Sequence, residues 1–145
     1  MPPIYVHADN SDPKNKVFIA SLAGKSAQVA ETKMQSTLVK MIGKNAGFTT
    51  NKIANPKGYM VVLKVNTLDA SNGQTKCEIK GSIERYPPTM TKSGASGTAM
   101  VTTAMSGKAT ASGADEQAII DCVEAITESL VAKSIPIMTA DMTKW

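Results

Sequence analysis

The residue types that carry most enzyme chemistry are scarce in this chain. Its 145 residues include one histidine, His7, and two cysteines, Cys77 and Cys122. His7 has only Asp9 as a close carboxylate in the sequence, whereas a metal site needs several convergent ligands. A Ser–His–Asp triad would have to use the same histidine, and the Gly-x-Ser-x-Gly motif is missing. We therefore expect a surface histidine and a protein that is not an enzyme, with no catalytic residues, cofactor or metal.

One segment could hold an anion. Gly24, Lys25 and Ser26 stand between an apolar stretch and an amphipathic one, as in a phosphate-binding loop. The full motif needs a glycine five positions before Gly24, where this chain has Ile19. We expect a turn in which Ser26 caps the next helix. A weak anion site at Gly24, Lys25 and Ser26 is the alternative, and it would belong to a small ligand-binding protein or enzyme.

The two cysteines are expected to meet in the core. Cys77 lies on the apolar side of an alternating stretch, and Cys122 lies on the apolar stripe of a helical one. They form either a disulfide or two adjacent buried thiols, because two cysteines are compatible with both.

Charge differs between the two expected helices. The outer side of the first is basic and that of the second is acidic, which indicates either two ordinary solvated faces or surfaces that meet between copies. A head-to-tail contact of that kind would produce rings or filaments. The net charge of +4 comes from lysines, with Arg85 the only arginine, so we expect no specific nucleic-acid partner. The charged residues in question are Lys33, Lys40, Lys44, Asp121, Glu124 and Glu128.

The elements that would position these residues follow from periodicity and turn signals. Residues 1–15 are rich in Pro, Asp and Asn and are expected to form an arm, followed by a single domain over 16–145. Helices are predicted from Ser26 to about 46 and from about 115 to 133, where Pro136 should stop the second. The Gly/Ser/Thr-rich segment 89–97 is either a linker or a loop that orders on a partner. Strands are predicted at 16–22, 48–53, 59–68, 75–86 and 98–111.

The fold class follows from the fourth of these strands. Cys77, Ile79 and Ile83 alternate with polar residues, which indicates one buried and one solvated sheet face. We predict an α/β domain of the α+β type: two layers, with a mostly antiparallel sheet of about five strands and two helices on one face. In the arm, Ile4, Tyr5 and Val6 could add a strand to a neighbouring molecule.

Three segments resemble the small α/β domain of bacterial envelope proteins, such as the N-terminal domain of TolB, the penicillin-binding-protein activator LpoB and the curli secretion lipoprotein CsgG. They are Val17-Phe18-Ile19-Ala20-Ser21-Leu22-Ala23-Gly24, Gly47-Phe48-Thr49 and Tyr59-Met60-Val61-Val62-Leu63-Lys64-Val65. The resemblance implies a non-enzymatic role in binding or assembly in the periplasm or outside the cell. The chain has no lipidation cysteine near its start and no pair of long amphipathic hairpins, so lipid anchoring and pore formation are not expected.

Taken together, the sequence predicts a self-assembling or partner-binding structural module of the bacterial envelope or extracellular space. Its partners would be other protein subunits, in a homo-oligomer or filament. No segment reaches the roughly 20 apolar residues of a membrane span, and the first seven residues do not read as a signal peptide.

Overall fold

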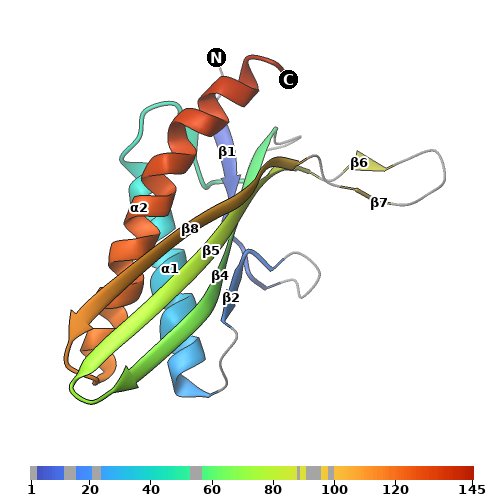
Figure 1. Ribbon diagram of the computed structural model, residues 1–145. Helices are drawn as coiled ribbons and strands as arrows, with labels where there is room; N and C mark the ends of the chain where they lie inside the picture. The colour runs from blue at the N-terminus through green and yellow to red at the C-terminus, as the bar shows by residue number, and fades with distance from the viewer. Residues whose placement is uncertain are drawn as a thin grey trace.

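The computed structural model describes residues 3–11, 16–20, 24–52, 57–87, 89–90, 96–97 and 100–145. Within them, a six-stranded sheet carries two helices on one face (Figure 1). The α+β class predicted from the sequence is confirmed, with six strands in the main sheet instead of five. The strands are β1 (Ile4–His7), β2 (Phe18–Ala20), β3 (Phe48–Thr49), β4 (Gly58–Ser71), β5 (Gln74–Tyr86) and β8 (Met100–Ser112). The helices are α1 (Lys25–Gly43) and α2 (Glu116–Met142).

A long antiparallel hairpin of β4 and β5 forms the middle of the sheet. Asn72 and Gly73 connect the two strands with φ of 54° and 70°, which is the left-handed conformation that such a turn requires. Along β5, Cys77, Ile79 and Ile83 are buried under the helices, and the residues between them lie on the other face. The alternation predicted from the sequence is confirmed here.

The start of the chain is part of the sheet, which corrects the expectation of an arm. β1 lies between β3 and β4 and pairs with both in parallel, and β2 pairs with β4 further along. The sheet is therefore mixed, with short parallel pairs on one side of the antiparallel hairpin. Tyr5 and Val6 are 2% and 0% exposed, because β1 has the core on one face and aromatic neighbours on the other. Ile4, Tyr5 and Val6 thus pair within their own chain and are not a spare strand.

The last helix extends well beyond Pro136, which was expected to end it. Pro136 lies inside α2, and the apolar stripe continues past it to Met138, which is 0% exposed. Proline at position 136 removes the backbone hydrogen bond to the Ala132 carbonyl, and the nearby hydroxyls bond to other carbonyls of the helix. The Ser134 and Thr139 hydroxyls donate to the carbonyls of Leu130 and Ile135 at 2.7 and 2.8 Å. Burial of the stripe outweighs the missing bond.

The helix starts differ from each other. Gly24, with φ of 79°, occupies the N-cap of α1 without a side-chain cap, so the prediction that Ser26 caps this helix is wrong. At the start of α2, the Asp115 carboxylate accepts a hydrogen bond from the Ala118 amide at 3.0 Å.

Several predicted segments fall partly outside the described residues: 21–23 of the first strand, residue 53 of the second, and 98–99 of the fifth. Residues 50–52 are described and are not part of a strand, so the second strand is shorter than predicted and ends at Thr49. In the segment 89–97, the structure describes two short paired strands, β6 (Thr89–Met90) and β7 (Ser96–Gly97). Residues 91–95 lie outside the description.

A substitution at Gly58 tests how closely the backbones of β1 and β4 approach each other. A Cβ at this position would lie 1.8 Å from the Tyr5 carbonyl oxygen, which is backbone and has little room to shift. We expect Gly58→Ala to lower the free energy of unfolding by more than about 3 kcal/mol, measured by urea denaturation. Gly43→Ala is the matched control: a Cβ there meets nothing within 4 Å, and the change should be neutral or stabilising by up to about 1 kcal/mol. Equal effects of the two variants would contradict this account.

Candidate functional site

The charged faces of the two helices lie against each other within one chain. The Lys33 ammonium forms an ion pair with Glu124, and Lys25 forms one with Glu116 at 3.2 Å. Asp121 accepts a hydrogen bond from Gln117 on its own helix. Lys33 and Glu124 of these faces are thus paired within one chain, and a contact between copies through the remaining charged residues stays a prediction. A groove of about 490 Å³ runs between the helices, lined by Lys33, Ser36, Thr37, Lys40, Met41, Lys44, Glu124 and Glu128.

The candidate anion site keeps its position at a helix start, but its lysine has another partner. Gly24 and Lys25 are exposed, and the Lys25 ammonium faces Glu116 across the helix pair. A carboxylate at this distance competes with a bound anion. The residues just before Gly24 lie outside the described part of the chain, and the anion site stays a prediction.

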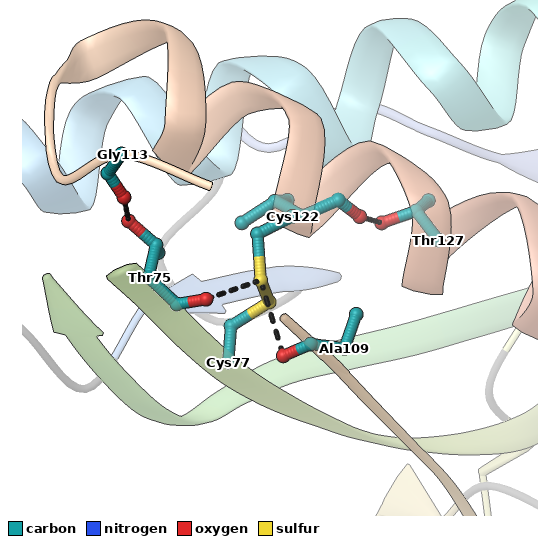
Figure 2. Close-up of a disulfide and its surroundings, with 7 residues drawn as sticks. Thr75, Cys77, Ala109, Gly113, Cys122 and Thr127 are labelled. Carbon is teal, nitrogen blue, oxygen red and sulfur yellow. Dashed lines mark hydrogen bonds between the residues drawn. A yellow bond between two sulfur atoms is a disulfide. The ribbon is translucent and has the colours of Figure 1, made fainter. Parts of the chain in front are cut away.

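Cys77 and Cys122 form a disulfide between β5 and α2 (Figure 2). They are 3% and 1% exposed, so the bond lies within the core. The structure thus resolves the two alternatives, disulfide or adjacent thiols, in favour of the disulfide. Thr75 anchors the same region by donating from its hydroxyl to the Gly113 carbonyl at 2.9 Å, and its position beside the disulfide is visible in Figure 2. A buried disulfide of this kind persists in oxidising compartments.

His7 is buried, which corrects the expectation of a surface histidine. Its ring stacks on Tyr86 with centroids 4.6 Å apart, and its Nδ1 lies 3.1 Å from the Tyr5 hydroxyl. Burial also raises the pKa of Tyr5 above its usual value. Across the described residues, no three His, Cys, Asp or Glu side chains converge as metal ligands. The aromatic cluster therefore acts in packing β1 against the end of β5.

A polar cluster holds the end of α2 on the sheet. The Arg85 guanidinium donates to both carboxylate oxygens of Asp141, at 2.9 and 3.1 Å, and the Tyr59 hydroxyl donates to Asp141 Oδ2 at 2.7 Å. The hydrogen bonds from Arg85 hold the pKa of Asp141 below its usual range, and burial raises the pKa of Tyr59. Trp145 covers the cluster: its ring lies 5.6 Å from that of Tyr59 and 5.1 Å from Arg85 Cζ.

Sequence reasoning missed this cluster, although one signal was present. Arg85 is the only arginine in the chain and was considered only as a nucleic-acid ligand. In the structure it lies directly opposite Tyr59 across the central hairpin, on the face that α2 covers. An arginine placed among the last residues of a half-buried strand predicts a carboxylate partner from the covering layer.

The face of the sheet away from the helices is polar around Lys64 and Lys80, whereas Tyr5, His7 and Tyr86 are buried at its other end. Lys64 lies opposite Lys80 across β4 and β5, and both are exposed. Glu78 accepts from Asn66 at 2.6 Å and faces Lys108 at 3.5 Å. Like charges placed directly opposite each other destabilise a pair of strands unless water surrounds them. This polar part of the face is therefore solvated in the isolated chain, and the helices cover the opposite face.

β8 lies at one edge of the sheet, where Figure 1 shows it beside α2. It pairs with β5 on one side, and no described strand pairs with its other side. Lys108 is its only charged residue. Met100, at 46% exposed, is one of two large hydrophobic side chains that the described part of the chain exposes. A long edge with unpaired amides and carbonyls is a site where another strand can add.

Comparisons with known proteins add a structural likeness. No protein-family model matches the chain, and no curated protein matches it. A crystal structure of a "putative lipoprotein" from Caulobacter crescentus CB15 matches with a TM-score of 0.44 and 14% identity, over 89% of this chain and 91% of that one. At this level of similarity the match supports no statement about function. In the described residues, no helix is long and apolar enough to cross a membrane.

The disulfide leads to a stability prediction. It closes a loop with a sequence separation of 45 residues, for which chain entropy gives a stabilisation of about 4 kcal/mol. We expect the double variant Cys77→Ala, Cys122→Ala to lose about 2–5 kcal/mol in urea unfolding, and a reductant to have no further effect on it. Protein alkylated on isolation from its host should carry no label on either cysteine until it is reduced. Free labelling of both without a reductant would contradict the disulfide.

The Asp141 cluster leads to a pH prediction. The pKa of Asp141 is lowered on folding, so its contribution is fully present above the unfolded pKa of about 3.9 and is lost as the pH falls through the folded value. We expect Asp141→Asn to cost about 1–3 kcal/mol at neutral pH and to flatten the loss of stability below about pH 4. Asp121→Asn, at an exposed position, should change stability by less than about 0.5 kcal/mol. Acid unfolding curves of Asp141→Asn and wild type that run parallel would contradict the role of this carboxylate.

Proposed function

We propose that this chain is a non-enzymatic protein-binding module that works in an oxidising compartment, the bacterial envelope or the extracellular space. The observation that carries the proposal is the edge of β8, a strand of 13 residues with no partner on its outer side among the described residues. Strand addition at such an edge supplies main-chain hydrogen bonds, and neighbouring side chains supply selectivity.

The surroundings of β8 support a surface built for contact. The helices cover one face of the sheet, so a strand added to β8 would have the solvated face on one side and the edge of the helix layer on the other. Lys108 and Glu78 lie next to each other on the solvated face, where they can bind polar side chains of a partner. Proteins usually protect such edges with charges, prolines or bulges, and in β8 the register shifts lie towards the Met100 end.

The disulfide supports the proposed oxidising compartment. A buried bond between β5 and α2 needs an oxidising environment to form and persist. The resemblance of the sequence to small envelope domains suggests the bacterial envelope among such environments.

Site-specific photo-cross-linking in the native host tests the proposal. A photoreactive residue at Thr110, exposed on β8, should give a discrete cross-linked protein band, whether that protein is another chain or a second copy. The matched control is Ser129, which is exposed on α2 away from the sheet face. Equal bands from both positions, or none from Thr110, would overturn the proposal.

A further inference from the structure

We infer that the strand added at β8 is β8 of a second copy of this chain, paired antiparallel about a two-fold axis at Ser106. The inference rests on the proposed function, since it names the partner at the same edge. β8 pairs regularly with β5 from Met105 to Ser112, so two copies would share main-chain contacts around Ser106 and join two six-stranded sheets into one.

The side chains of two β8 strands are complementary when the strands pair antiparallel. In an antiparallel pair centred on Ser106, Met105 lies opposite Gly107, and Lys108 lies opposite Ala104. Beyond Ala104, the two register shifts of β8 interrupt this one-to-one pairing. In the regular part around Ser106, each of the two large side chains meets a small one, which is the arrangement that packs without overlap. The only charged residue of the strand does not face its own copy, so like-charge repulsion is avoided.

The two faces of the sheet continue correctly at the centre of such a pair. Residues directly opposite each other in an antiparallel pair lie on the same face. Within the chain, Met105 and Gly107 pair with the buried residues Gly81 and Ile79 and so lie on the helix side. In the proposed dimer, Met105 of one copy faces Gly107 of the other, so both residues stay on the helix side of the joined sheet. Both helix layers would therefore lie on the same face of the joined sheet.

Apolar surface at this edge would be covered in the dimer. Val101, Met105, Ala109 and Ala111 are partly buried and pack on the core from β8. A strand added beside β8 would lie within contact distance of these side chains. Met100, which is 46% exposed, would lie beside the partner's strand end. This apolar margin is better matched by a second β8, which is itself rich in Ala, Thr and Met, than by a strongly charged segment.

Other surfaces compete less well for a second copy. In the groove between the helices, Lys33 of the basic wall is already paired with Glu124 of the acidic wall. The strand formed by Ile4, Tyr5 and Val6 is already paired on both sides within its own chain. An isologous contact at β8 also closes after two copies, so it predicts a discrete dimer in place of the ring or filament that a head-to-tail contact would build.

Engineered cysteines test the register directly. Ser106 of one copy faces Ser106 of the other, with Cβ atoms about 5 Å apart in such a pair, so purified Ser106→Cys should form an inter-chain disulfide under mild oxidation. Thr110→Cys is the matched control: it is exposed on the same strand, but the two copies of residue 110 would lie about 27 Å apart. Covalent dimer from both variants at equal rates, or from neither, would overturn the proposed pairing.

Charge reversal at the axis tests the interface in solution. Light scattering should show a wild-type dimer that persists at about 1 M salt, since backbone pairing and apolar contacts are screened little. Ser106→Glu and Ser106→Lys should each raise the dimer dissociation constant at least about tenfold, because each places like charges opposite each other, and mixing the two variants should restore the dimer. Ser129→Glu and Ser129→Lys, on exposed α2, should leave it unchanged.

Different experimental results would overturn the β8 dimer and the proposed binding function. A wild-type monomer at about 1 mM, far above a micromolar dissociation constant, overturns the second copy as partner, and a Thr110 cross-link to a different protein would still support a binding module. A dimer that is indifferent to both charge variants overturns the β8 contact. A monomer combined with no cross-link at Thr110 overturns both.

Discussion

The antiparallel pairing of β4 with β5 is the interaction on which the rest of the structure depends. β1 and β2 attach to β4 on one side, and β8 attaches to β5 on the other. The helix layer is held to the same hairpin by covalent and ionic links, through Cys77 to Cys122 and through Arg85 to Asp141. Because one pair of strands organises both layers, whatever that pair leaves uncovered becomes the surface of the protein. The uncovered parts are one polar face and one long edge.

Much of the central hairpin and of the helix packing could be predicted from the sequence, because local chemistry determines both. The Asn72-Gly73 turn needs positive φ, and Cys77, Ile79 and Ile83 alternate with polar residues, so the strand and its buried face follow from neighbouring residues alone. β1 was missed because Ile4–His7 is short and lies in a segment rich in Pro, Asp and Asn. Its place between β3 and β4 depends on partners more than forty residues away. The extension of α2 beyond Pro136 was missed for a similar reason, since burial of Met138 by distant residues outweighs a local preference.

In the candidate site, too, some features follow from neighbouring residues and others depend on distant contacts. That Cys77 and Cys122 meet follows from two predicted inward faces that must pack together. The partners of the charged residues do not follow in that way, because the rotation of each helix about its axis decides whether Lys33 faces water or Glu124. The edge of β8 has no sequence motif at all. It becomes a candidate only when the strand order is known, since the same residues placed in the middle of the sheet would have no free backbone groups.

The strand order also constrains how the chain acquires its structure as it is made. β4 and β5 are adjacent in sequence and can pair as soon as both exist, as local contacts form quickly. β1 and β2 are synthesised first, but their strand partners in the described part of the chain are β3 and β4, so these two apolar segments lack those partners until β4 emerges. Cys77 likewise precedes Cys122 by 45 residues, so the disulfide cannot form before α2 has been made. Both strands of the central hairpin therefore exist before the covalent link to the helix layer, and any factor that shields β1 and β2 during synthesis would act on the strands that are made first and paired last.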